Sequence, residues 1–255
     1  MRTRRYKTRS PFAHAAGPLL YQLKTIVAKH PRVALPIARW RGHGFPLAAD
    51  TEVLIEGYPR SANSFSVAAF ELAQGRPVKI AHHLHAPAHV IAAINAGVPA
   101  LVLIRDPEDA VLEFVIVKPR IGIRQAVLGY LRFYGPLVPH RSDFVMGSFE
   151  EVTSDFGAVI RKLNERFGTS FREFQHSDEN VQTVFDAMER YWRGRVGEGV
   201  QLERVVGRPS EVRERMKEGL PARYRAETTR ELRARAQALH DRLLSAGAGS
   251  SDLGR

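Results

Sequence analysis

One stretch of the chain constrains its fold more than any other: a short apolar run that turns sharply and continues as a helix. Residues 51–56 (TEVLIE) have the length and the aliphatic content of a buried strand. Gly57 and Pro59 mark a turn directly after it. From about Ser64 the apolar residues recur at helical spacing, at Phe65, Ala68, Ala69 and Leu72. A strand that feeds straight into a helix favours an α/β architecture.

The same alternation continues along the chain. We expect strands at 78–81, 100–104 and 143–149, and helices at 88–96, 123–137, 181–192 and 227–244. A further helix should begin at a cap formed by Thr153 or Ser154 and end at Gly168. The predicted fold class is therefore α/β, with a central parallel sheet flanked by helices and a helical C-terminal half.

Composition sets the domain organisation and excludes some chemistry. The 255 residues are 44% hydrophobic, enough for one sizeable core. We expect a basic, partly ordered N-terminal extension at 1–50, an α/β domain at 51–244, and a flexible Gly/Ser-rich tail at 245–255. Because the chain contains no cysteine, disulfides, a thiol nucleophile and cysteine-based metal sites are excluded.

The net charge of +11 favours a polyanionic partner without choosing among nucleic acid, anionic lipid, a nucleotide and an acidic polysaccharide. The fairly apolar stretch 18–40 is interrupted by Lys24, Lys29 and Arg32, so it should not span a membrane. It could instead lie on an anionic membrane surface, or form a short helix after a basic tail. We expect a cytoplasmic protein, with peripheral contact to an anionic membrane through the basic N-terminus as the alternative, and the sequence leaves its oligomeric state open.

The turn at 58–65 has the features of a phosphate cradle. The first amides of a helix lack internal acceptors, and the helix dipole favours an anion beside them. Arg60 adds a cation, and Ser61, Asn63 and Ser64 add short polar groups. A polar helix cap without a ligand would have a similar sequence. The loop is not a Walker A motif, because the Gly-Lys-Ser/Thr ending is missing.

A second candidate follows the strand at 100–104. Arg105 stands at the carboxyl end of that strand, where parallel α/β sheets bind their ligands. Its guanidinium could hold a second phosphate through two parallel hydrogen bonds. It could equally form a simple ion pair with Glu108 or Asp109.

Taken together, the two loops resemble a known family. GYPRSANSF (57–65) and LIRDPEDA (103–110) are similar to the first and second nucleotide loops of sulfotransferases that use 3′-phosphoadenosine 5′-phosphosulfate (PAPS), and FEEVTSDF (149–156) is similar to a third stretch. The resemblance covers roughly residues 51–170. It implies a P-loop-NTPase-like fold, with the 5′-phosphosulfate on the first loop and the 3′-phosphate on the second.

Carried over by position, the resemblance implies a nucleotide site with two departures. Arg60 stands where the family usually has lysine, and Glu113 stands where a serine usually contacts the 3′-phosphate. A carboxylate beside a phosphate repels it, so Glu113 points away, or the nucleotide binds differently, or activity is reduced. The implied nucleotide-binding residues are Arg60, Ser61, Ala62 (commonly glycine), Asn63, Ser64, Phe65, Arg105 and Glu113, with Arg208 and Arg213 from a C-terminal basic run that also contains Ser210 and Lys217.

Histidines crowd the end of the second predicted strand, at His82, His83, His85 and His89. The resemblance implies that one of them is the general base. His83 has the matching spacing before Arg105 and is followed by leucine, whereas His85 precedes Ala-Pro. Four close histidines also suggest a metal, but no carboxylate with ligand spacing lies nearby in sequence, and no metal is expected. At least two of the four are expected to be structural or solvated.

The implied function is transfer of a sulfuryl group from PAPS to an acceptor hydroxyl, with 3′-phosphoadenosine 5′-phosphate (PAP) as the product. The acceptor class would be a saccharide, a polysaccharide or a lipid-like molecule, and no specific nucleic acid is expected. Two alternatives remain: a non-catalytic module that binds nucleotide or polyanion, and a kinase-like P-loop enzyme.

Overall fold

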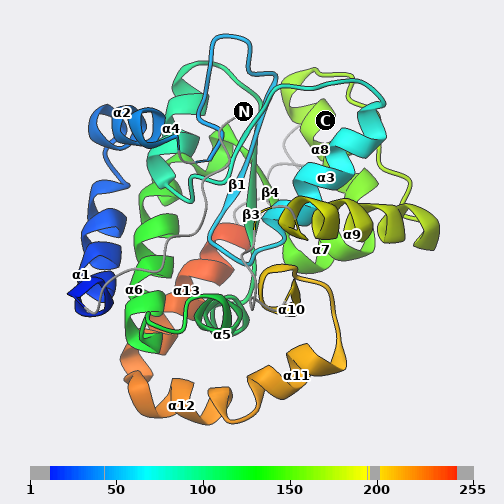
Figure 1. Cartoon of the computed structure of the whole chain (residues 1–255). Helices are drawn as coiled ribbons and strands as arrows, with labels where there is room; N and C mark the ends of the chain where they lie inside the picture. The colour runs from blue at the N-terminus through cyan, green and yellow to red at the C-terminus, as the bar shows by residue number, and fades with distance from the viewer. Residues whose placement is uncertain (1–11, 43, 194, 196–201, 246–255) are drawn as a thin grey trace.

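The computed structural model describes residues 12–42, 44–193, 195 and 202–245. Its centre is a four-stranded parallel sheet with the strand order β2-β1-β3-β4 (Figure 1). Strands β1 (Val53–Gly57) and β3 (Ala100–Ile104) lie in the middle, between β2 (Ile80–His82) and β4 (Val145–Ser148). All residues of β1, β3 and β4 are buried, as expected for a parallel sheet covered on both faces.

Helices account for most of the remaining described chain. They are α1 (Phe12–Val27), α2 (Pro31–Arg41), α3 (Asn63–Gln74), α4 (Pro87–Asn95), α5 (Pro107–Val117), α6 (Ile123–Tyr134), α7 (Phe149–Ser154), α8 (Phe156–Phe167), α9 (Asp178–Arg193), α10 (Leu202–Val205), α11 (Glu211–Lys217), α12 (Leu220–Glu227) and α13 (Arg230–Ser245), with a 3₁₀ helix at Gly135–Asp143.

The strands divide the core into two hydrophobic clusters because successive side chains point to opposite faces of a sheet. Leu54 and Val102 pack with α4, α5, α6 and α13 on one face. Val53, Ile55 and Leu101 pack with α3, α8 and α9 on the other. Figure 1 shows these two helical layers on either side of the sheet. The predicted α/β class, with a central parallel sheet and a helical C-terminal half, is confirmed.

The capping prediction for the helix at 156–167 is wrong in one respect. An unexpected short helix, α7, contains Thr153 and Ser154, whose hydroxyls donate back to carbonyls of its own first turn. Asp155 caps α8 instead, because its carboxylate accepts from the amide of Ala158. Gly168 ends α8 in the left-handed conformation, as predicted.

The N-terminal segment contains two helices, of which α1 packs on α6 and α2 on α4. The Gln22 side chain donates to the carbonyl of Gln125, and Tyr21 lies 5.5 Å from the ring of Phe114. The expected boundary at residue 50 stays a prediction, and the tail residues 246–255 lie outside the described part of the chain. No described helix is both long and apolar enough to cross a membrane.

The C-terminal elements return to the sheet's carboxyl edge. Helices α10, α11 and α12 form an arc at the bottom of Figure 1, and both α11 and α12 contact α5. Helix α13 then packs on α6. This return places α10 beside the loop that follows β1, where Arg60 donates to the carbonyl of Val205.

Candidate functional site

The loop between β1 and α3 is held in an unusual backbone conformation. Arg60 (φ 74°) and Ala62 (φ 65°) both adopt the left-handed region, which favours glycine. His83 (φ 60°) and His85 (φ 51°), after the adjacent strand, do the same. These four are the only described non-glycine residues with positive φ. Such strain persists where surrounding contacts enforce it, and it clusters at functional sites.

Gly57 is required where the loop begins. A Cβ at this position would lie 2.6 Å from the carbonyl oxygen of Leu103, so only glycine lets β1 approach β3 so closely. The Asn63 side chain then closes the turn by donating from Nδ2 to the carbonyl of Tyr58 at 2.9 Å.

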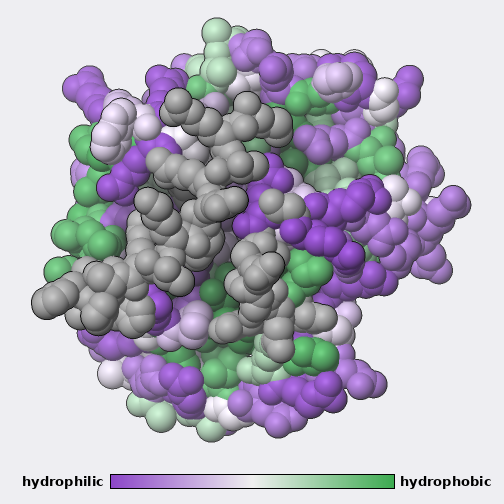
Figure 2. Space-filling view, viewed as in Figure 1, coloured by the Kyte–Doolittle hydropathy of each residue, from purple (hydrophilic) through white to green (hydrophobic). Residues whose placement is uncertain are grey.

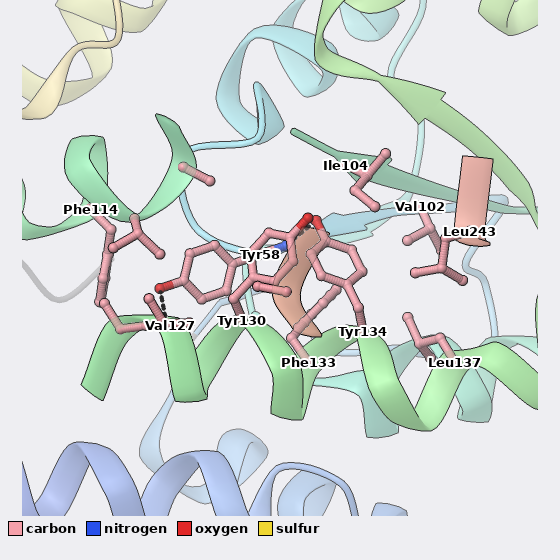
Figure 3. Close-up of a cluster of buried hydrophobic side chains, with 14 of the residues drawn as sticks. Tyr58, Val102, Ile104, Phe114, Val127, Tyr130, Phe133, Tyr134, Leu137 and Leu243 are labelled. Carbon is pink, nitrogen blue, oxygen red and sulfur yellow. Dashed lines mark hydrogen bonds between the residues drawn. The ribbon is translucent and has the colours of Figure 1, made fainter. Parts of the chain in front are cut away.

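Buried tyrosines hold the loops after β1 and β3 in place through hydrogen bonds (Figure 3). The Tyr134 hydroxyl donates to the carbonyl of Leu103 at 2.6 Å and accepts from the amide of Tyr58 at 3.3 Å. The Tyr58 hydroxyl donates to a carbonyl of α6, and the Tyr130 hydroxyl donates to the carbonyl of Arg105. Helix α6 therefore fixes the positions of both loops relative to the sheet.

The predicted loop residues do not all face the same way. Ser61 is fully buried, and its hydroxyl lies 3.4 Å from that of Tyr134, below the loop. Phe65 packs among aromatic rings that include Phe185. Ser64 faces the histidines, with Oγ 3.1 Å from Nε2 of His83. The guanidinium of Arg60 donates to the carbonyl of Val205 at 3.0 Å. The first amides of α3 lack acceptors within the helix and lie where the helix dipole favours an anion.

Arg105 forms the ion pair that its sequence position allowed, and it also keeps a donor that could bind an anion. Its guanidinium lies 3.9 Å from the ring centroid of Phe149 and pairs with Asp109 at 3.4 Å. Nη1 donates to the carbonyl of Arg60, which joins the second loop to the first. Nε is buried and has no hydrogen-bond partner among the described residues. An unsatisfied buried donor on a cation is a group that a bound anion could satisfy.

Glu113 points into a cluster of cations. Its carboxylate is buried on α5 and forms ion pairs with Arg213, with Lys217 at 3.2 Å and with Arg60 at 3.6 Å. Burial, together with the nearby charges of Arg60 and Arg105, lowers the pKa of Arg213 to about 9. Glu113 therefore faces these cations, and how it lies relative to a bound 3′-phosphate stays a prediction.

Arg213 and Arg208 differ sharply, although both lie in the C-terminal basic run. Arg213 is buried beside Glu113, and Ser210 caps its helix by accepting from its amide. Arg208 instead turns to α9, where it donates to Gln182 at 2.7 Å and pairs with Glu189 at 3.5 Å. The structure therefore brings Arg213, but not Arg208, to Arg60 and Arg105.

The histidines surround a buried carboxylate that sequence reasoning missed. Glu56, the fourth residue of β1, accepts from the amides of Leu84 (2.6 Å) and His85 (3.2 Å) and from Nδ1 of His89 (2.9 Å). Burial alone would raise the pKa of Glu56, but the hydrogen bonds and charges of these neighbours outweigh it and hold the pKa at about 2. The only available signal was a lone glutamate inside an apolar strand.

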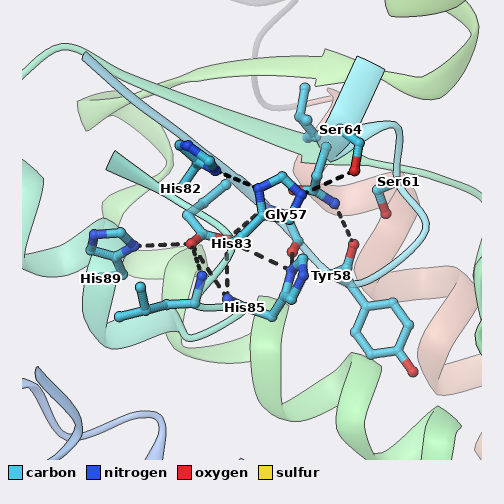
Figure 4. A network of polar contacts seen from close by, with 12 residues as sticks. Gly57, Tyr58, Ser61, Ser64, His82, His83, His85 and His89 are labelled. Atoms are coloured by element: carbon cyan, nitrogen blue, oxygen red, sulfur yellow. Dashed lines mark hydrogen bonds and ion pairs between the residues drawn. The ribbon is translucent and has the colours of Figure 1, made fainter. Parts of the chain in front are cut away.

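His83 and His85 differ in which ring nitrogens are engaged (Figure 4). His83 uses both, with Ser64 at Nε2 and His82 at Nδ1, 2.5 Å away. His85 places Nδ1 2.8 Å from the carbonyl of Gly57, and no described residue hydrogen-bonds its Nε2. A carbonyl only accepts, so Nδ1 of His85 carries the proton and Nε2 is the basic nitrogen. Burial lowers the pKa of His85 to about 4, so the ring is neutral at pH 7.

These groups line one cleft of about 1520 Å³. Its walls include Arg60, Arg105, Glu113 and Arg213 as well as His85. Apolar and aromatic side chains complete the lining, among them Phe45, Phe133, Tyr191 and Trp192. Among the described residues, no group of three or more His, Asp or Glu side chains is arranged to hold a metal ion.

The chain was compared with family models, curated proteins and solved structures. No family model matches the chain, and no curated protein matches it. Among solved structures the chain is similar to the mouse sulfotransferase SULT7A1 complexed with PAP, at 12% identity and a TM-score of 0.40. That alignment covers 82% of this chain and 89% of the mouse chain.

Proposed function

We propose that this protein transfers a sulfuryl group from PAPS to an acceptor hydroxyl. One observation carries the proposal: three arginines from separate segments, Arg60, Arg105 and Arg213, converge beside the N-terminus of α3. The neutral ring of His85 lines the same cleft. The two loops are the same segments whose sequences resemble the PAPS-binding loops. Cations support a doubly phosphorylated nucleotide, and a neutral base supports proton removal from a hydroxyl.

The residues present fit such a donor. The first amides of α3 and the Arg60 guanidinium would hold the 5′-phosphosulfate and stabilise charge on the leaving phosphate. Arg105, with its unsatisfied Nε, and Arg213 would hold the 3′-phosphate. Burial, reinforced by the nearby charge of Arg105, lowers the pKa of Arg60 to about 10, which still leaves it cationic at neutral pH. The donor supplies an activated sulfuryl group that needs no redox step.

We assign the general base to His85 rather than His83. The carbonyl of Gly57 fixes the proton on Nδ1 of His85, so Nε2 can accept the proton of the acceptor hydroxyl as its oxygen bonds to sulfur. Glu56 orients the same residue through its backbone amide. His83, with both nitrogens already engaged, would position Ser64 at the start of α3.

The test is transfer of labelled sulfate from PAPS over panels of saccharide, polysaccharide and lipid-like acceptors. We expect His85→Asn to lower kcat by about 10²–10⁴-fold, the usual contribution of a general base. His83→Asn is the comparison variant: it removes a ring that would position Ser64 without accepting the proton, so it should lower kcat much less than His85→Asn does. Loss of activity only in His83→Asn would transfer the role to His83. No transfer to any acceptor, by a folded protein that binds PAP, would refute the transferase.

A second candidate is a module that binds nucleotide or polyanion without transfer. The observation that favours it is Glu113, which already neutralises part of the cation cluster. Calorimetry with PAP, ATP and a heparin-like polymer separates the candidates. Tight binding of PAP over ATP supports the sulfotransferase, binding of polymer alone supports the module, and preference for ATP would support a kinase-like enzyme.

A further inference from the structure

The exposed large hydrophobic side chains gather on one part of the molecule. Ten such residues are exposed in the described chain, and eight of them lie between residues 19 and 45. Trp40 is the most exposed, at 83%, and Leu19 follows at 64%. The other six are Leu20, Leu23, Ile26, Val33, Ile37 and Phe45. An apolar gathering of this kind marks an interaction surface.

The two helices present these side chains as regular stripes. On α1, Leu19, Leu23 and Ile26 have the spacing i, i+4, i+7, which places them on one face. On α2, residues 33, 37 and 40 repeat the same spacing. We call these two stripes, with Leu20, the α1–α2 face. In Figure 2 hydrophobic atoms lie along the left edge of the molecule, where Figure 1 places α1 and α2.

The opposite sides of the same helices hold them on the domain. Gln22 and Thr25 of α1 contact Arg132 of α6. Ala28 and Ala38 are buried in a small cluster with Leu84 and Ala86. The α1–α2 face is therefore presented outward by helices that are fixed from behind.

Basic residues accompany the apolar stripes. Lys29, Arg32, Arg39 and Arg41 are exposed at or beside α2. The printed sequence before α1 adds five basic residues among its first nine: Arg2, Arg4, Arg5, Lys7 and Arg9. No acidic residue occurs from position 1 to position 49. An apolar stripe bordered only by positive charge is complementary to anionic lipid.

We propose that the α1–α2 face docks on the surface of an anionic bilayer, with Trp40 and the leucines entering the boundary between headgroups and acyl chains. A second copy of this chain fits less well, because a symmetric contact through this face would bring two sets of like charges together. The cleft borders α1 through Thr25, which faces α6 on the side of the helix opposite the α1–α2 face. The docking itself does not depend on the proposed sulfuryl transfer.

Co-sedimentation of the full chain with vesicles tests the docking. We expect binding to vesicles containing about one third phosphatidylglycerol and little binding to phosphatidylcholine alone. Leu23→Ser combined with Trp40→Ser should weaken binding more than about tenfold. Leu72→Ser, which removes an exposed leucine of α3, is the matched control and should bind as the unmodified protein does. None of these side chains lines the cleft.

Charge and insertion have separate readouts. Arg32→Gln and Arg41→Gln should each weaken binding about fivefold, the effect of one basic residue near an anionic surface. Emission of Trp40 should shift to the blue on anionic vesicles only, with Trp192 as the constant background. Equal binding to neutral vesicles, unchanged binding by the Leu23/Trp40 variant, or concentration-dependent dimerisation through this face without vesicle binding would each overturn the proposal.

Discussion

Replacing Glu113 with glutamine gives the sharpest test of the cation cluster. Glu113 is 4% exposed and Arg213 is 2% exposed, so their ion pair is almost wholly removed from water. Removal of one partner from a buried ion pair costs about 3–5 kcal/mol, because an uncompensated charge remains. Glutamine keeps the size and one oxygen of the side chain, so we expect a loss near 3 kcal/mol.

Thermal unfolding measures this loss. For a chain of this size, 1 kcal/mol corresponds to about 2–4 °C in Tm, so Glu113→Gln should lower Tm by about 6–12 °C. Glu108→Gln is the control, since Glu108 lies on the same helix and forms no ion pair with another residue of the described chain. Its Tm should stay within about 2 °C of the original, as is usual for substitutions outside such networks.

The response of Tm to PAP distinguishes a change in the charge of the cation cluster from a general loss of folding. Without the carboxylate, Arg60, Arg213 and Lys217 keep their charge and lack a shared counterion. Saturating PAP should therefore raise the Tm of Glu113→Gln by more than it raises that of the unmodified protein. An unchanged Tm in the variant, or an equal response of both proteins to PAP, would refute the view that Glu113 neutralises an anion-binding cluster.

The remaining predictions concern the support of the loop and the effect of acid. Tyr134→Phe removes the hydroxyl that bonds to Leu103 and Tyr58, so the free energy of unfolding, measured with denaturant, should fall by about 1–3 kcal/mol. Tyr191→Phe, at an exposed tyrosine, is the control and should not cause this loss. Gly57→Ala should destabilise the fold by about 1–3 kcal/mol or prevent folding, because its Cβ meets the Leu103 carbonyl at 2.6 Å; equal stability would contradict the close approach. Burial lowers the pKa of His82 to about 3 and of His85 to about 4 from the ordinary 6.5. Below pH 6.5 the unfolded chain therefore binds protons that the folded chain does not. The free energy of unfolding should fall from pH 6.5 toward pH 4 by about 1.4 kcal/mol per pH unit for each such proton. Denaturation midpoints that do not change with pH across that range would contradict the neutral, buried rings.

Local patterns were sufficient to predict the sheet and its loops. The run at 100–104 is wholly apolar between two turn signals, and the structure has a strand at those residues. The strand at 51–56 and the helix after it were predicted for the same reason, since their hydrophobic periodicity does not depend on distant contacts.

The chemistry of the site depends on contacts that no local pattern contains. The groups that lower the pKa of Glu56 lie 28–33 residues further along the chain, in the turn after β2 and at the start of α4. Arg213, the closest counterion of Glu113, lies 100 residues away. From residue type alone, Glu56 was therefore taken for an ordinary strand residue. Glu113 was taken for a carboxylate that would repel the 3′-phosphate.

The N-terminal helices carry charged residues that interrupt an apolar stretch of the sequence but border an apolar surface in the fold. Along the sequence, Lys24, Lys29 and Arg32 break the apolar stretch and exclude a spanning helix. In the fold, Pro31 opens a second helix, and the two short helices carry their apolar residues outward while the cations flank them. The same charges that argue against a membrane span therefore favour attachment to an anionic membrane surface, which is why vesicle charge is the decisive variable in testing the α1–α2 face.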